Sequence, residues 1–282
     1  MRKSCILAIL LLAALTGCIG GTTETGLSFA GSGLSIFLKV PQETSPSTPV
    51  SILAYVKNMA SENASEISVY LQRLEDWNLQ NALQTLSLLR PKDTYVFSWV
   101  AYSPSVTNKT YNPKVDVFYK MNTTASLKLR IYDNNYLESL PQSKRDEIKK
   151  KSALLSFTSS SGTPVSIFTE IKQPFVLAYE TQEFPFIINI RNVGNGLIYS
   201  PTSDYRFLTV LTSNQTVFDA SSNYTLSCDV GEHALLQLGQ SKAVVCKIIA
   251  KRSEIVNYID VSVELKLAYA YLYSVNASIK VK

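Results

Sequence analysis

Residues 259–273 have the sequence IDVSVELKLAYAYLY, in which apolar side chains occupy every second position. The odd positions from Ile259 to Tyr273 are all aliphatic or tyrosine, whereas the even positions begin with aspartate, serine, glutamate and lysine. Side chains of a β-strand alternate between its two faces, so the pattern predicts a strand with one buried face. Its length exceeds that of an ordinary strand, which predicts a bend or bulge. After Ser274-Val275-Asn276, residues 277–281 are expected to pair back as a hairpin.

The first half of the chain closes with a similar pattern. Residues 115–121 alternate, a turn is predicted at Asn122-Thr123-Thr124, and residues 127–131 alternate again. A shift of 152 residues superposes Tyr119 on Tyr271, and the residues around them also correspond. The sequence therefore predicts an internal repeat.

The openings of the two halves also correspond. Residues 52–58 and 186–192 are both apolar strands that end on a basic residue followed by asparagine. In the second copy this asparagine begins Asn192-Val193-Gly194-Asn195-Gly196, which predicts a turn whose glycines permit positive φ. The first copy has Met59-Ala60-Ser61-Glu62 at this place and lacks both glycines.

A strand that ends in Asn-X-Gly-X-Gly within a seven-stranded sandwich resembles the cell-adhesion-related (CARDB-like) β-sandwich domains of bacterial and archaeal surface proteins. With its terminal Tyr-X-Tyr strand, the chain also resembles membrane-anchored archaeal surface proteins that carry tandem immunoglobulin-like modules. The resemblance covers most of residues 164–282 and, less clearly, 34–133. It implies a role in adhesion, scaffolding or presentation at the cell surface, and it transfers no catalytic residues.

The predicted fold is all-β, with two tandem immunoglobulin-like β-sandwiches at residues 34–140 and 163–282. Residues 141–162 are predicted to be a short helical or irregular linker, because residues 141–151 are densely charged and lack period-two alternation. Within this linker Lys149 to Lys151 are interpreted as solvated, with contact to anionic lipid headgroups as the alternative.

The N-terminus has the pattern of an export signal. Arg2 and Lys3 precede an apolar run from Ile6 to Leu15, which is shorter than the about 20 residues that a transmembrane helix needs. The run ends in Leu15-Thr16-Gly17-Cys18, which resembles the lipobox of bacterial and archaeal lipoproteins. The resemblance implies a cleaved signal peptide at residues 1–17 and a lipid on Cys18; the alternative is an ordinary secretory signal.

This N-terminal pattern predicts where the protein resides. Residues 18–33 are rich in Gly, Thr and Ser and are expected to form a flexible tether. The protein is expected on the extracellular face of the cell membrane, with the lipid as its membrane attachment and a cell-envelope protein or glycan as its partner. The formal net charge is +5, and removal of the two signal-peptide cations leaves +3, so nothing indicates nucleic-acid binding.

The cysteines and the sequons predict covalent modification. Cys5 lies in the signal and Cys18 takes the lipid, which leaves Cys228 and Cys246 as a disulfide pair. Closing this loop is expected to contribute roughly 3 kcal/mol on the chain-entropy model. Six Asn-X-Ser/Thr sequons are glycosylation candidates, expected in loops or at strand ends. They are Asn63, Asn108, Asn122, Asn214, Asn223 and Asn276.

Catalytic chemistry has little support in the sequence. His233 is the only histidine and no Gly-X-Ser-X-Gly turn occurs, which argues against a serine triad and a catalytic zinc. The carboxylate pairs Glu75-Asp76 and Asp146-Glu147 are adjacent and would point in different directions on regular elements. No calcium loop, phosphate loop or dinucleotide fingerprint is present. We therefore expect no catalytic residues, metal or cofactor.

Aromatic residues are the remaining candidates for a binding site. They are Trp99, Tyr102, Tyr111 and Tyr119, which are interpreted as core or cross-strand residues, with a carbohydrate-stacking platform as the alternative. Trp77 lies among charged residues and is expected to be an exposed contact residue.

The expected function is that of a non-enzymatic surface lipoprotein that serves as a structural, adhesion or protein-interaction module. The alternatives are a substrate-binding lipoprotein of a transporter and a lipid-anchored carbohydrate-binding protein. A transporter-type binding protein normally alternates strands and helices around a cleft, a pattern that this sequence lacks.

Overall fold

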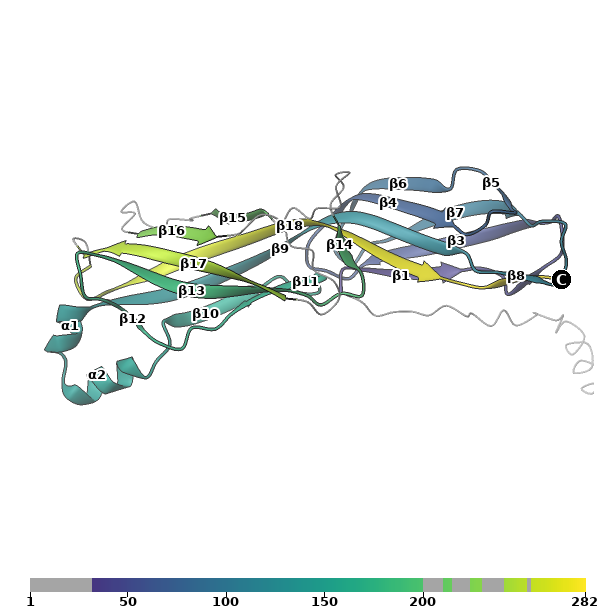
Figure 1. Ribbon diagram of the computed structural model, residues 1–282. Coiled ribbons are helices and arrows are strands. Elements are labelled where there is room, and N and C mark those ends of the chain that lie inside the picture. The colour runs from purple at the N-terminus through teal and green to yellow at the C-terminus, as the bar shows by residue number, and fades with distance from the viewer. Residues whose placement is uncertain (1–31, 200–209, 215–223, 230–240, 253–254) are drawn as a thin grey trace, which may run out of the picture.

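The structure, a computed structural model, describes residues 32–199, 210–214, 224–229, 241–252 and 255–282. These residues form β-sheets that are arranged as two sandwiches, end to end, in an elongated molecule (Figure 1). The prediction of an all-β fold built from sandwiches is confirmed.

One layer of each sandwich is a four-stranded antiparallel sheet. In the first sandwich its order is β1 (Leu34–Lys39), β3 (Pro49–Asn58), β7 (Thr94–Tyr102) and β5 (Asn78–Leu79). In the second sandwich its order is β11 (Val165–Thr169), β13 (Thr181–Asn192), β17 (Ser241–Lys251) and β16 (Tyr224–Asp229). The two sheets have equivalent strand orders: β1, β3 and β7 of the first correspond to β11, β13 and β17 of the second.

The other layer is a large sheet that both sandwiches share. Its strand order is β14 (Leu197–Tyr199), β18 (Tyr258–Asn276), β9 (Lys114–Asp133), β4 (Ala64–Gln72) and β6 (Leu83–Leu89). Three further strands join it, β10 (Leu154–Ser159) and β12 (Phe175–Leu177) on β9 and β15 (Val210–Asn214) on β18. A small sheet at one end of the molecule contains β2 (Glu43–Thr44), β19 (Ile279–Val281) and β8 (Lys109–Tyr111).

The two longest strands run through both sandwiches (Figure 1). They pair continuously from Tyr258↔Tyr132 to Asn276↔Lys114. β4 pairs with the first part of β9, up to Met121, whereas β10 pairs with β9 from Ala125 onward. At about 3.3 Å per residue, the 20 residues of β9 span about 65 Å. The sandwiches are therefore joined by two continuous strands.

The period-two pattern explains why one face of these strands is buried throughout. The odd positions of β9 from 115 to 131 and of β18 from 261 to 275 are all buried, in both sandwiches. The buried hydrophobic residues form a continuous cluster that extends from Ile36 in the first sandwich through Tyr119 to Ile248 in the second. Packing, as well as backbone pairing, thus continues across the junction.

Two of the predicted turns are wrong. Asn122-Thr123-Thr124 lie inside β9 rather than in a turn, because the buried parity continues without interruption from Met121 through Thr123 to Ala125. The terminal strand β19 does not fold back on β18; it pairs with β2 and β8 instead. The predicted domain ranges are therefore not separate in space: β9 from the range 34–140 extends into the second sandwich, and β18 from the range 163–282 extends into the first.

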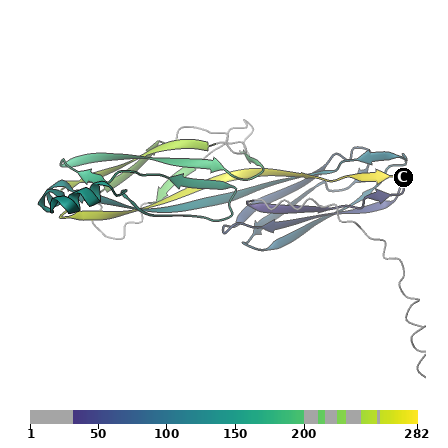
Figure 2. The same cartoon turned by 90° about the horizontal axis from the view of Figure 1, so that it is seen from below.

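The predicted linker contains a helix, but it does not lie between the sandwiches. α1 (Asn134–Ser139) follows β9 directly, and Asp133 caps it by accepting a hydrogen bond from the Tyr136 N–H at 3.0 Å. α2 (Gln142–Lys149) follows, and then β10 returns along β9 inside the range 141–162. Both views place the helices at the end of the second sandwich, opposite the C-terminus (Figures 1 and 2).

The predicted disulfide between Cys228 and Cys246 is present. The two cysteines are direct cross-strand neighbours on β16 and β17, with 4.0 Å between their Cα atoms. The disulfide therefore links two strands of one sheet, within the second sandwich.

Candidate functional site

The junction between the sandwiches, which we call the waist, is built around a pair of tyrosines. Tyr119 and Tyr271 face each other across β9 and β18, with 5.6 Å between their ring centroids. The sequence repeat superposes these same two residues. Tyr119 and Tyr271 are thus equivalent in the repeat and are also direct neighbours across the two strands. The two halves of the chain are therefore related by approximate two-fold symmetry about this pair.

Asn192 connects the waist to the second four-stranded sheet. Its side chain is fully buried; Oδ1 accepts hydrogen bonds from the Gly194 N–H at 3.1 Å and the Tyr271 hydroxyl at 3.0 Å, and Nδ2 donates to the Gly196 carbonyl at 3.0 Å. The Tyr271 hydroxyl in turn accepts from the Gly196 N–H at 2.8 Å. The asparagine thus holds the turn that follows β13 against the shared sheet.

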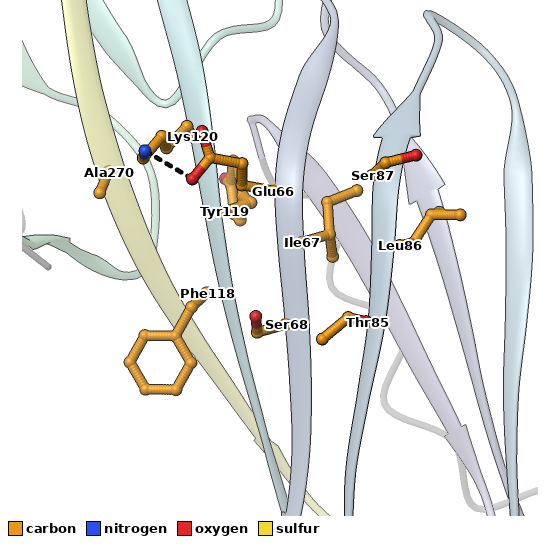
Figure 3. A pocket seen from close by; sticks show the side chains of 10 residues that line it. All are labelled: Glu66, Ile67, Ser68, Thr85, Leu86, Ser87, Phe118, Tyr119, Lys120 and Ala270. Carbon is orange, nitrogen blue, oxygen red and sulfur yellow. Dashed lines mark ion pairs between the residues drawn. The ribbon is translucent and has the colours of Figure 1, made fainter.

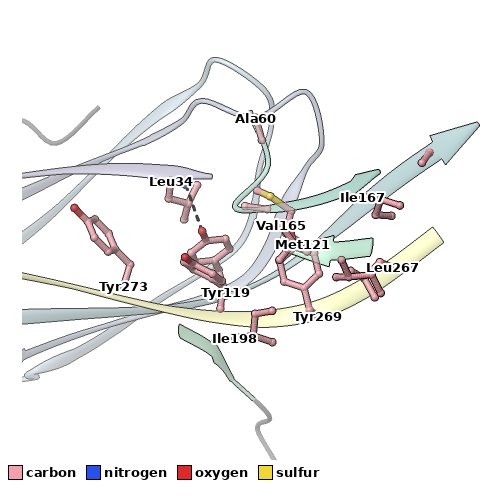
Figure 4. Packing of buried hydrophobic residues seen from close by; sticks show 14 of the residues in the cluster. Leu34, Ala60, Tyr119, Met121, Val165, Ile167, Ile198, Leu267, Tyr269 and Tyr273 are labelled. Carbon is pink, nitrogen blue, oxygen red and sulfur yellow. Dashed lines mark hydrogen bonds between the residues drawn. The ribbon is translucent and has the colours of Figure 1, made fainter. Parts of the chain in front are cut away.

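Asn58 performs the same task in the first copy. It is also fully buried, and its Oδ1 accepts from the Ala60 N–H at 3.0 Å while Nδ2 donates to the Glu62 carbonyl at 2.8 Å. Nearby, the Tyr119 hydroxyl accepts from the Leu34 N–H at the start of β1 (Figure 4). Asn58 and Asn192 therefore have the same arrangement in the two halves of the chain. The sequence showed only that both strands end in asparagine.

The glycines of the Asn-X-Gly-X-Gly turn serve a different purpose from the predicted one. Neither Gly194 nor Gly196 has a positive φ. A Cβ on Gly194 would collide with the Tyr271 hydroxyl, and a Cβ on Gly196 would collide with the Leu272 carbonyl. These glycines permit close packing of the turn on β18.

Burial sets the ionisation of the waist tyrosines. Burial raises the pKa of Tyr271 to about 12, and the pKa values of Tyr119 and Tyr269 are also raised, chiefly by burial. Tyr269 shares a hydrogen bond of 3.1 Å with Thr123, whose hydroxyl donates to the Val165 carbonyl. The raised pKa values keep these phenols protonated at neutral pH, so their hydroxyl groups remain available for the hydrogen bonds of the waist.

A shallow hollow of about 600 Å³ lies on the outer face of the shared sheet, next to the waist (Figure 3). It is formed where β4 bulges: pairing with β9 shifts between Ser65 and Ser68, and Glu66 has a φ of +49°. The bulge directs the Glu66 carboxylate toward Lys120, whose Nζ lies 2.5 Å away. A bulge that re-aims a side chain in this manner is common beside binding sites.

The walls of the hollow combine an aromatic ring with hydroxyl groups. Phe118 lies on one side, and Ser68, Thr85 and Ser87 line the floor and the other side (Figure 3). This site was not predicted from the sequence, although the buried positions of β4 change from even at Ala64 to odd at Ile67, which is the signature of a bulge. Such a set of groups can hydrogen-bond a polar ligand while one apolar ring packs on it.

A second candidate surface is the outer face of the first four-stranded sheet. Phe37, Tyr55 and Val96 lie in one row across β1, β3 and β7, and the Phe37 and Tyr55 rings are 5.9 Å apart. Val100 and Tyr102 extend the apolar surface along β7, with 58% and 50% of their areas exposed. Exposed apolar side chains grouped in this way are typical of interaction surfaces.

The predicted aromatic residues do not form a common platform. Trp99, Tyr111 and Tyr119 are buried, as their interpretation as core residues predicted, whereas Tyr102 is half exposed on a different face. The expectation for Trp77 is wrong: it is buried and packs edge-on against Tyr111, with ring centroids 5.6 Å apart. Its charged neighbours in sequence lie in a turn that folds the indole inward.

The glycosylation candidates occupy different environments. Asn63, Asn108 and Asn276 are exposed, in loops or at a strand end. Asn122 is the exception to the expected placement, because it lies inside β9 and is only partly exposed. Asn214 ends β15, but its side chain lies outside the described residues, as do Asn223, His233 and the predicted lipid-bearing Cys18.

Neither α1 nor α2, the helices of the described ranges, is long and apolar enough to cross a membrane. In the same part of the chain, no cluster of three or more His, Cys, Asp and Glu residues is placed to hold a metal ion.

No protein-family model matches the sequence, and no curated protein matches it. Among solved structures 46 chains match, including Escherichia coli alpha-2-macroglobulin activated by porcine elastase, at 9% identity and a TM-score of 0.21. The alignment covers 88% of this chain and 33% of that chain, so this chain spans about a third of the length of the protein it matches. A TM-score of this size supports no conclusion about fold or function.

Proposed function

We propose that the protein is a non-enzymatic, lipid-anchored protein of the outer cell surface, which acts as a rigid spacer and presents interaction surfaces. The single observation that carries the proposal is the passage of β9 and β18 through both sandwiches. A lipid at Cys18, an archaeal host and a relationship to immunoglobulin-like adhesion modules belong to the same proposal, on the strength of the sequence resemblances.

The waist supports a spacer over a hinged binding protein. A transporter-type binding protein closes two lobes around its ligand through a hinge of a few residues in loops or at the ends of elements. Here, residues 114–132 of β9 pair without interruption with β18, and the side chains of Tyr119, Tyr271 and Asn192 are buried at the waist. Bending at this place would break backbone pairing and core packing together.

Rigidity is tested by distance measurement between the sandwiches. We would place spin labels at Ser51→Cys on β3 and Ala243→Cys on β17, both exposed, in the chain from residue 19 onward. One narrow distance distribution, unchanged by peptides or sugars from cell envelopes, is expected. A broad distribution, or one that shortens when such ligands are added, would favour the hinged binding protein.

Anchoring is tested by substituting the cysteine. In a host that processes lipoproteins, Cys18→Ala should release the protein from the membrane fraction, whereas Cys5→Ala should leave it attached. Release of neither variant, or of both equally, would contradict attachment through Cys18.

The hollow favours a second candidate function, the binding of a carbohydrate. An aromatic side chain, a carboxylate, an ammonium group and hydroxyls line it, and each of these groups interacts with sugars. Binding to a panel of oligosaccharides should weaken in Lys120→Met and Phe118→Ala and should persist in Lys128→Met, an exposed lysine on the same strand. Equal binding by all variants would exclude the hollow as the site.

A further inference from the structure

The end of the molecule that carries the helices, here called the distal tip, has unusual surface features. It comprises α1, α2, the turn at residues 178–180 and the described residues 251, 252 and 255–257. The two most exposed of its large apolar side chains are Val256, with 85% of its area exposed, and Tyr179, with 71%. No other large apolar side chain in the described residues exceeds 58% exposure.

Hydrogen bonds show that these segments lie together. The Arg252 N–H donates to the Glu180 carbonyl at 2.9 Å, and Arg252 Nε donates to Asp133 Oδ2 at 3.1 Å. The Asp133 N–H in turn donates to the Asn257 carbonyl at 2.9 Å. Because Asp133 also caps α1, the turn that carries Tyr179, the segment that carries Val256 and the first helix are fixed to one another.

A cationic segment adjoins these apolar side chains. Residues 142–151, which include α2, carry five basic side chains against two acidic ones. Lys144 and Lys151 form ion pairs with Glu147, whereas the exposed Lys149 and Lys150 have no carboxylate partner among the described residues. Lys151 also lies near Tyr132, whose ring is 6.0 Å from that of Tyr258 at the start of β18. Lys251, also exposed, ends β17 at the same tip.

We propose that the distal tip is a docking site for an anionic lipid bilayer, into whose interface Val256 and Tyr179 insert while Lys149, Lys150 and Lys251 contact the headgroups. Apolar and tyrosine side chains that protrude from a surface partition into the membrane interface, and basic side chains beside them are attracted to anionic headgroups. Most acidic side chains of the tip are engaged: Glu147 pairs with Lys144 and Lys151, and Asp146 and Glu138 accept hydrogen bonds from Gln142 and Asn134. Glu180 is exposed beside Tyr179, so the tip keeps one acidic side chain among its basic ones.

A bilayer fits these features better than a folded protein partner. The two exposed apolar side chains come from different segments, Tyr179 from the turn before β13 and Val256 from the segment after β17, rather than from one sheet face. Protruding side chains can each enter a soft interface, whereas a rigid partner would need a matching cavity for each one. The proposal does not depend on the lipid anchor, because the tip would contact the membrane through its own side chains.

The test is cosedimentation of the chain from residue 19 onward, which lacks Cys18, with vesicles of phosphatidylcholine alone or mixed with phosphatidylglycerol. Binding to the anionic vesicles only, weakened by added salt, is expected. The double variant Lys149→Glu/Lys150→Glu should bind about tenfold more weakly or worse. Val256→Asp with Tyr179→Ser should weaken binding by a similar factor.

Matched controls lie on the first sandwich. Lys57→Glu/Lys280→Glu reverses two other exposed lysines, and Leu83→Ser with Val106→Asp alters a similarly exposed apolar pair. These variants should bind vesicles as the parent does, and circular dichroism should show that all variants are folded. Failure of the parent to bind anionic vesicles, or equal weakening by tip and control variants, would overturn the proposal without affecting the spacer function.

Discussion

Asn192 shows at the residue scale how the waist is held. Its fully buried amide satisfies the Gly194 N–H and the Gly196 carbonyl and accepts from the Tyr271 hydroxyl. Asn192→Ala would remove the side-chain donor to the Gly196 carbonyl and the acceptor of the Tyr271 hydroxyl, which is expected to lower the free energy of unfolding by about 2–4 kcal/mol. Urea unfolding measures the loss. Asn189→Ala, on the same strand but facing outward, should change stability by less than about 0.5 kcal/mol, and equal losses would contradict this role.

The waist tyrosines predict a loss of stability in alkali. Unfolded tyrosine has a pKa of 10.0, whereas burial raises the pKa of Tyr271 to about 12 and also raises that of Tyr119. Because the folded pKa is the higher one, the contribution of Tyr271 is complete below about pH 10 and is lost as pH rises from about 10 to about 12, and Tyr119 adds a loss of the same sign above about pH 10. Within this window each such tyrosine should lower the free energy of unfolding by about 1.4 kcal/mol per pH unit.

Tyrosinate absorbance checks this pH dependence. A group of tyrosines should ionise only together with unfolding, and the urea midpoint should fall over the same pH range. Complete ionisation of every tyrosine while the chain remains folded would contradict the burial of the waist hydroxyls.

At the scale of elements, β18 predicts a specific sensitivity to proline. Ala268 is exposed and lies in the middle of β18, paired with Asn122 of β9 and Val210 of β15. Proline would remove a ladder hydrogen bond and clash with the neighbouring strand, so Ala268→Pro should cost about 3 kcal/mol or more. Ala268→Thr retains the backbone donor and suits a strand, so its thermal midpoint should stay near that of the parent. Similar midpoints for both variants would contradict a continuous β18.

The period-two pattern predicted β18 as one long strand, but it divided β9 into two strands, 115–121 and 127–131, at a turn that does not exist. Asn122-Thr123-Thr124 resembles a turn in composition, yet Thr123 continues the buried parity of Met121 and Ala125, and its hydroxyl is satisfied by Val165 and Tyr269. Val165 and Tyr269 are distant from Thr123 in the sequence, so local composition cannot indicate these contacts. The partners of β19 are likewise fixed by tertiary contacts, because a strand pattern specifies a buried face but not a neighbour.

The candidate sites were less predictable than the fold. The bulge at Glu66 was encoded by a shift of parity between Ala64 and Ile67, whereas the proximity of Lys120 depends on the pairing of β4 with β9. Trp77 was expected to be exposed because of its charged neighbours, and its burial depends on Tyr111 of β8. At the distal tip, the segments that carry Tyr179 and Val256 are held at the same end of the molecule by hydrogen bonds of Arg252 and Asp133, which the sequence does not indicate.

At the scale of the whole molecule, the central claim is that the two sandwiches form one cooperative unit through β9, β18 and the waist. The chain provides separate reporters for this claim. Both tryptophans, Trp77 and Trp99, are buried in the first sandwich, whereas the Cys228–Cys246 disulfide lies in the second. A perturbation in one sandwich can therefore be observed in the other.

The most direct measurement is urea unfolding of Cys228→Ser/Cys246→Ala, followed by tryptophan fluorescence and by far-ultraviolet circular dichroism. Loss of the disulfide should lower the free energy of unfolding by about 3 kcal/mol. We predict that the tryptophan midpoint falls and coincides with the circular dichroism midpoint, although both tryptophans are in the intact sandwich. An unchanged tryptophan transition, preceded by a separate loss of strand signal, would show that the sandwiches unfold independently and would contradict the shared-strand account.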